Sequence, residues 1–103
     1  METRADFCID YEERAALLKA LANPVRLRIL HVLRTEGCRN VRCIEARTGM
    51  SQSCISQHLQ RLRSARLVGA ERVGNEVFYQ IASPEVAELV DTLTEREWER
   101  HVL

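Results

Sequence analysis

The sequence lacks any run of apolar side chains approaching the ~20 residues that span a bilayer. Residues 1–14, METRADFCIDYEER, are acidic and have no apolar core, which argues against a signal peptide. Repeats, low-complexity tracts and linkers are also missing, and 103 residues suffice for one compact domain but not for two. We therefore expect a soluble cytoplasmic protein that forms a single domain over residues 1–103, without a membrane partner.

The residue patterns of common enzyme classes are missing as well. There is no paired acid–base constellation, no glycine-rich phosphate loop and no arrangement suited to a catalytic triad, so we expect no enzymatic activity. The four cysteines show no CxxC or CxC spacing, which in a reducing cytosol predicts free thiols, metal ligands or redox switches instead of a disulfide framework. They are Cys8, Cys38, Cys43 and Cys54.

The formal net charge is zero, but the charges are distributed unevenly. Residues 24–74 carry 10 arginines and 3 acidic residues, whereas residues 1–23 and 75–103 carry net charges of −2 and −5. A basic middle with acidic flanks favours a nucleic-acid-binding surface in the middle of the chain. The neutral total is also compatible with a protein–protein interaction module, and failure to bind any DNA at low salt would favour that alternative.

The spacing of apolar residues predicts a run of helices with one β-hairpin near the end. The expected helices cover residues 11–22, 24–34, 41–48, 52–65 and 84 to about 101, and the hairpin covers residues 67–82.

Local signals support these boundaries. Asn23-Pro24 and Ser83-Pro84 each combine a good N-cap with a proline that is tolerated at the first helical position. Gly49 is a predicted left-handed C-cap, and Ser51 a predicted N-cap. Gly74-Asn75 favours positive φ between two β-rich segments. We therefore expect a mainly α fold with a two-stranded β-hairpin (α+β), in which a helix-turn-helix is followed by a wing.

The predicted helix 52–65 has an apolar stripe and a polar face that lies opposite it. At 100° per residue, Ile55, Leu59 and Leu62 share one side. The opposite side has hydroxyls and amides but no acid, and such side chains suit the edges of DNA bases. The candidate base-reading residues on this side are Ser53, Ser56, Gln57 and Gln60.

Arginines surround this helix, and the guanidinium fork is suited to phosphate. The main candidates for phosphate contacts are Arg61, Arg63 and Arg66 at the end of the helix and Arg72 in the wing. Arg39, Arg42 and Arg47, around the preceding helix, are further candidates, and any of these arginines would otherwise be solvated.

Three segments together resemble the ArsR/SmtB-type repressors: LKALANPVRLRILHVL (18–33), SQSCISQHLQRLRSARLV (51–68) and VGNEVFYQI (73–81). The resemblance covers nearly the whole chain. It implies a homodimeric winged-helix repressor that binds an inverted-repeat operator in double-stranded DNA, needs no cofactor for binding, and leaves when an inducer binds. It carries DNA contact onto Gln52, Ser53, Ser56 and Gln57 and onto the wing around Gly74.

The resemblance further implies that the first and last helices form the dimer interface. The last helix has an apolar surface that a small monomer would cover poorly. This surface comprises Val86, Leu89, Val90, Leu93 and Trp98.

Two metal-site patterns of the resembled family are missing. Asp91 is followed two residues later by Leu93 where a histidine is needed, and His101 is followed by Val and Leu. CRNVRCIEA (38–46) has Asn40 and Arg42 where a Cys-x-Cys pair would stand. Another thiolate arrangement of the family joins an N-terminal cysteine to a Gly-Cys ahead of the third helix, which Cys8 and Gly37-Cys38 resemble.

A soft thiolate site would select arsenite, As(III), or a soft metal ion as the inducer. Its candidate ligands are Cys8, Cys38 and Cys43. Alternatively, Cys38 and Cys43 form a disulfide in a redox- or reactive-sulfur-sensing repressor, or these cysteines are simply small buried residues.

Cys54 lies beside the polar face of helix 52–65, near the start of that helix. We expect it to pack against the preceding helix, although it is also a candidate reactive thiol. His58, four residues later, is an alternative metal ligand together with Cys54, and His31 is expected to be packed inside an apolar run.

Overall fold

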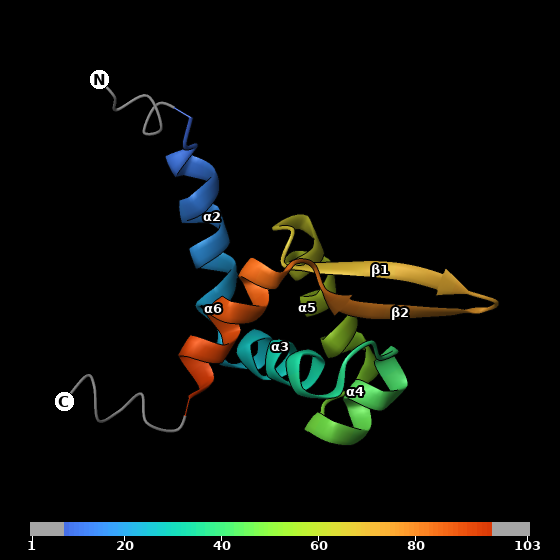
Figure 1. Cartoon of the computed structure of the whole chain (residues 1–103). Helices are drawn as coiled ribbons and strands as arrows, with labels where there is room; N and C mark the ends of the chain where they lie inside the picture. The colour runs from blue at the N-terminus through green and yellow to red at the C-terminus, as the bar shows by residue number, and fades with distance from the viewer. Residues whose placement is uncertain (1–7, 96–103) are drawn as a thin grey trace.

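The computed structural model describes residues 8–95 and confirms the expected fold class. A helical body carries a two-stranded antiparallel hairpin that projects from it (Figure 1). In chain order the elements are α2 (Tyr11–Leu21), α3 (Pro24–Glu36), α4 (Val41–Thr48), α5 (Gln52–Ser64), β1 (Val68–Val73), β2 (Glu76–Ile81) and α6 (Pro84–Thr94). The last helix ends earlier than predicted, because α6 stops at Thr94 and Glu95 has an extended backbone. Trp98 and His101 lie outside the described residues.

The predicted helix starts are confirmed by their hydrogen bonds. Asn23 Oδ1 accepts from the N–H of Val25 at 2.9 Å and of Arg26 at 3.1 Å, with Pro24 in the first turn of α3. Ser83 Oγ accepts from the Val86 N–H at 3.2 Å, with Pro84 in the first turn of α6. These caps satisfy amide groups that have no partner inside the helix, so the local sequence alone determines where both helices begin.

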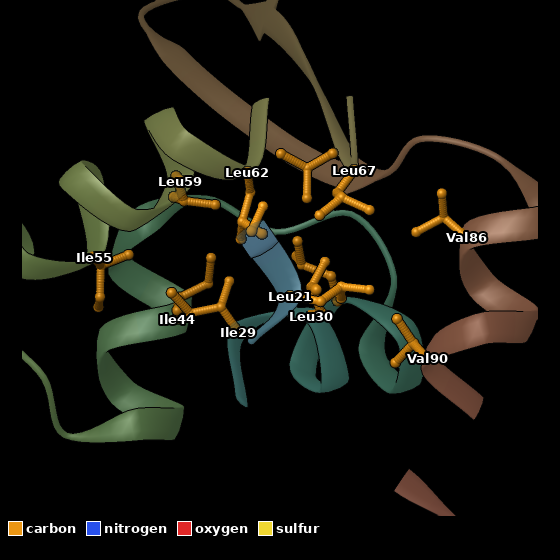
Figure 2. Close-up of a cluster of buried hydrophobic side chains, with 13 residues drawn as sticks. Leu21, Ile29, Leu30, Ile44, Ile55, Leu59, Leu62, Leu67, Val86 and Val90 are labelled. Atoms are coloured by element: carbon orange, nitrogen blue, oxygen red, sulfur yellow. The ribbon is translucent and has the colours of Figure 1, made fainter. Parts of the chain in front are cut away.

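One hydrophobic core connects all five described helices and the base of the hairpin. Figure 2 shows Leu21 of α2, Ile29 and Leu30 of α3, and Ile44 of α4 facing the same interior. The predicted apolar stripe of α5 is part of this core, because Ile55, Leu59 and Leu62 are all fully or almost fully buried. Leu33, Leu67, Val68, Val86 and Val90 complete most of the remaining core. The expectation that Val86 and Val90 belong to an uncovered dimer surface is therefore wrong, because both pack inside the protomer.

The hairpin turn differs in detail from the prediction. Val73 pairs with Glu76, which leaves the expected two-residue turn at Gly74-Asn75. However, Gly74 has φ 65° whereas Asn75 does not have a positive φ. A positive φ at the first central residue alone is the sign pattern of a type II′ turn, for which glycine at that position is the usual requirement. Both strands nevertheless lie within the predicted hairpin, residues 67–82.

Two backbone features were not predicted from the sequence. Arg39 and Tyr79 exchange backbone hydrogen bonds of 3.0 and 2.8 Å, so the segment before α4 forms an extra bridge to the wing. Arg66 has φ 64°, and the bonds from its N–H to Arg63 O and from Leu67 N–H to Leu62 O make a Schellman motif after α5. The left-handed residue of that motif is usually glycine, which is why the sequence contained no signal for it.

The expected packing of His31 is wrong, because its side chain is exposed on α3. Its neighbours Leu30 and Leu33 fill the core instead, so the apolar run has one polar residue on the outer side of the helix. Within the described range, no helix is long and apolar enough to cross a membrane.

Candidate nucleic-acid interface

α4 and α5 form a helix-turn-helix unit whose two helix starts are capped. Asn40 Oδ1 accepts from the Cys43 N–H at 2.9 Å, and Ser51 Oγ accepts from the Cys54 N–H at 3.2 Å. Gly49 lies between the helices with φ 75° and ψ 11°, the predicted left-handed C-cap. These caps and the buried side of α5 fix which side of this helix faces outward.

The outward side of α5 contains only neutral polar side chains along most of its length. The structure places all five candidate base-reading residues on the exposed surface: Gln52, Ser53, Ser56, Gln57 and Gln60. None of them makes a side-chain hydrogen bond to another described residue, so their donors and acceptors are available to a partner. Ser56 and Gln60 also border a hollow of about 380 Å³ together with Arg63 and with Tyr79 of the wing.

Three arginines near this face have uncompensated charges. Arg61 and Arg63 at the end of α5 and Arg72 on β1 are exposed, and no carboxylate of residues 8–95 lies within 4.0 Å of them. Arg72 Nε donates to Gly74 O at 3.3 Å, which keeps the guanidinium at the tip of the wing. A free guanidinium is the group best suited to a forked contact with phosphate.

The other candidate arginines already have acidic partners. Arg47 pairs with Glu36, and Arg39 Nε lies 3.5 Å from the same carboxylate. Arg42 lies 3.4 Å from Glu76. Arg66, at 3.9 Å from Glu13, is also paired, although both side chains are largely exposed. The arginines of the basic segment without a carboxylate partner among the described residues therefore lie at the end of α5, at the wing tip and on α3, where they are Arg26 and Arg28.

Glu76 connects the wing to the helix-turn-helix unit. One of its carboxylate oxygens accepts from Asn40 Nδ2 at 3.3 Å, and the other accepts from Arg42 at 3.4 Å. Asn40 thus caps α4 with its oxygen and contacts the wing with its nitrogen. Together with the backbone bridge from Arg39 to Tyr79, these contacts position the wing relative to α4. The sequence contained no signal for them because the partners are far apart along the chain.

His58 lies on α5 behind the exposed polar side of this helix, and Arg26 Nε donates to its Nδ1 at 3.2 Å. Partial burial and the charges of Arg26 and Arg61 lower the pKa of His58, so its imidazole is neutral at physiological pH. Because Nδ1 already accepts a hydrogen bond, that nitrogen is not available for the metal site considered with Cys54.

The four thiols are dispersed. Cys8, Cys38 and Cys43 are exposed, and Cys54 is half-buried beside the exposed polar side of α5. Cys38 Sγ lies 3.6 Å from Gln80 Oε1 on the wing. Over residues 8–95 of one subunit, no three His, Cys, Asp or Glu side chains come close enough to hold a metal ion. The structure therefore does not bring Cys8, Cys38 and Cys43 together within a protomer.

Comparison with known proteins matches this chain to bacterial transcription regulators. Residues 23–69, which include α3, α4 and α5, match the family model described as "Bacterial regulatory protein, arsR family". The chain is 42% identical over 81 residues to the HTH-type transcriptional regulator Rv0081 of Mycobacterium tuberculosis, covering 78% of this chain and 70% of that protein. It is 34% identical over 96 residues to the transcriptional repressor PagR of Bacillus anthracis, covering 90% and 96% of the two chains.

Among solved structures, the homodimeric winged helix-turn-helix DNA-binding domain Mb0332 of Mycobacterium bovis matches with a TM-score of 0.80 and 36% identity. The match covers 99% of this chain and 90% of that domain. At this coverage the similarity includes the helices on both sides of the helix-turn-helix unit as well as the unit itself.

Proposed function

Because this chain belongs to the arsR family of bacterial regulatory proteins, which are DNA-binding transcription regulators and not enzymes, we propose that it is a repressor that binds an inverted-repeat operator as a homodimer. The observation that carries the proposal is the exposed neutral face of α5, with free guanidinium groups at its end. An ordinary solvated helix face would more often have Glu and Lys, whereas amides and hydroxyls suit base edges in the major groove. DNA binding in this proposal requires no cofactor.

The side chains on this surface have two proposed roles. The amides and hydroxyls of the α5 face read bases, with glutamine suited to a bidentate contact with adenine. The free arginines contact phosphates on both sides of the groove, which positions the protein without reading sequence. The base-reading set is Gln52, Ser53, Ser56, Gln57 and Gln60. The phosphate set is Arg61, Arg63 and Arg72, and Gly74 at the tip of the wing lies against the DNA backbone.

Homodimerisation is supported by apolar side chains that the protomer leaves uncovered. Tyr11 and Leu18 on α2 are 64% and 59% exposed, and Leu93 on α6 is 38% exposed. The N-terminal part of α2 projects from the helical body in Figure 1, while its C-terminal end packs against the core through Leu21. A projecting element of this kind suits packing against a second copy. A two-fold dimer would present two α5 helices about one DNA turn apart, ~34 Å.

The proposed inducer is arsenite or a soft metal ion that binds cysteine thiolates. The exposure of Cys8, Cys38 and Cys43 supports this proposal, because all three thiols are accessible to a ligand. Since they form no three-ligand group within the described part of one subunit, the proposal requires Cys8 of one protomer to approach Cys38 and Cys43 of the other. Three thiolates would satisfy As(III), and soft sulfur ligands disfavour hard cations.

A second candidate is a redox or reactive-sulfur sensor, because Cys38 and Cys43 are both exposed and therefore accessible to an oxidant. In this candidate, a peroxide accepts two electrons from Cys38 and Cys43, which release two protons and form a disulfide. No metal-binding cluster is needed for this reaction, which is consistent with the absence of one from residues 8–95.

DNA binding is tested by selecting ligands for the wild-type protein from random duplexes at low salt. The proposal predicts an inverted repeat with half-sites 10–10.5 base pairs apart, about one helical turn. If no duplex is enriched and none binds at low salt, the fold serves protein–protein interaction instead.

The inducer is tested by measuring release of the selected duplex with arsenite, antimonite, cadmium, zinc, hydrogen peroxide and polysulfide. Arsenite or a soft metal should release it from the wild type but not from Cys38→Ser, while the matched control Cys54→Ser keeps the response. Release by peroxide or polysulfide alone, with a mass change that shows a Cys38–Cys43 bridge, supports the redox candidate. Unchanged release from a variant that lacks all four cysteines contradicts both.

A further inference from the structure

A cationic hollow of about 450 Å³ lies where α2, α3 and the end of α5 meet. Lys19, Arg26 and Arg61 line it, one from each helix, together with Ser64 and three alanines. No acidic residue lines the hollow, and within residues 8–95 neither Lys19 nor Arg61 has a carboxylate within 4.0 Å. Three cations converge here from separate helices without compensation, which differs from the ion-paired arginines around α4.

The guanidinium of Arg26 is held in place from two sides. Its Nε donates to His58 Nδ1 at 3.2 Å, and its Nη1 donates to Ala20 O at 3.1 Å. A guanidinium has five N–H donors, so three remain for another partner. Because its neighbours already fix the side chain, little additional ordering would be needed to bind an anion.

His58 lies behind Arg26 and does not change the charge of the hollow. Partial burial lowers the pKa of this imidazole, and the charges of Arg26 and Arg61 lower it further. The imidazole is therefore neutral, with Nδ1 accepting from Arg26 and the proton on Nε2, so it neither adds to the charge of the hollow nor compensates it.

The α2 wall of the hollow borders the exposed apolar residues of the proposed dimer face. At 100° per residue, Lys19 is 100° and Ala16 about 160° from Leu18, the most prominent residue of the proposed dimer face after Tyr11, and both also line a second surface hollow together with Leu18. A second copy that packs on Leu18 would therefore lie next to Lys19 at the edge of the hollow.

We propose that this hollow is a binding site for a phosphate-type oxyanion. Lys19 supplies a point charge, the two guanidinium groups supply forked donors, and the Ser64 hydroxyl supplies a neutral donor. The phosphate group belongs either to the DNA backbone beside the α5 helix or to a free anion. In both cases the bound phosphate group connects α2 to the end of α5.

The test titrates the full-length protein, without DNA, with inorganic phosphate and follows backbone amide resonances by NMR. Chloride at matched ionic strength serves as the reference. Saturable shifts at Lys19, Arg61 and Ser64 are expected with phosphate only. Lys19→Gln should weaken phosphate binding about tenfold, as expected for loss of one charge-assisted hydrogen bond. The matched control Arg28→Gln, which removes an exposed arginine of α3 outside the hollow, should leave it unchanged.

Absence of saturable shifts, equal shifts with chloride, or equal weakening by Lys19→Gln and Arg28→Gln would overturn the proposal. None of these readouts depends on DNA binding, so the proposal can fail or succeed independently of the repressor function.

A second arm of the experiment identifies the source of the phosphate. If the DNA backbone fills the hollow, inorganic phosphate no longer shifts these resonances in the complex with the selected duplex, and Lys19→Gln weakens DNA binding. If a free anion fills it, phosphate binds the complex as well, and Lys19→Gln leaves DNA affinity without phosphate unchanged.

Discussion

Replacing one free arginine at the end of α5 should change the salt dependence of DNA binding by a predictable amount. Each protomer has three uncompensated arginines in the proposed phosphate set, so a dimer would neutralise six phosphates. For B-DNA the slope of log K against log[salt] is about −0.9 per phosphate contact, which gives a slope of about −5 for the wild type. Arg63→Gln removes two contacts per dimer, so the slope should fall in magnitude by about 1.8.

In terms of affinity, the wild type should lose about 10³-fold between 50 and 200 mM salt, and Arg63→Gln only about 10²-fold, as expected from counterion release. The assay is fluorescence anisotropy with a labelled duplex across this range of salt. The matched control is Arg47→Gln, which removes an arginine of the same basic segment that is already paired with Glu36. Its slope should remain that of the wild type. Equal changes in the two variants, or no change in Arg63→Gln, would refute the assignment of free and paired arginines.

Three further predictions concern stability and assembly. Two hydrogen bonds of 2.8 Å from Arg34, together with its charge, lower the pKa of Asp91. In urea denaturation, the wild type should therefore lose stability relative to Asp91→Asn as pH falls below about 3.9, the usual pKa of an unfolded aspartate. The sign follows because the unfolded state binds the proton more readily than the folded state. Arg66→Gly should raise the free energy of unfolding by about 0.5–1 kcal/mol by relieving the left-handed backbone, whereas Arg66→Ala should not. Leu18→Glu should convert the dimer to a monomer in sedimentation velocity, and an unchanged dimer would remove α2 from the interface.

The elements of this fold were predictable because their signals are local. Caps such as Asn23 and Ser83 satisfy amides two or three residues away, and the apolar stripe of α5 depends only on the helical repeat. The exposed face of α5 follows from the same repeat once Ile55 and Leu59 are known to be buried.

The unpredicted features depend on tertiary contacts or on a residue type that gives no signal. The contact of Glu76 with Arg42 joins residues 34 positions apart, and the Arg26–His58 bond joins residues 32 apart. Arg66 occupies a position where glycine is usual, and His31 lies on the outer side of α3 within an apolar run. The distinction between free and paired arginines, on which the electrostatic predictions depend, therefore required the structure.

The central claim, that the neutral face of α5 reads DNA sequence, is tested most directly by the specificity of Gln57→Ala. The measurement compares its dissociation constants for the selected inverted repeat and for a scrambled duplex of equal length at one salt concentration. A lost bidentate base contact costs about 1–3 kcal/mol, so affinity for the inverted repeat should fall at least about fivefold while affinity for scrambled DNA stays the same. An equal loss on both duplexes, or no loss on either, would contradict the claim.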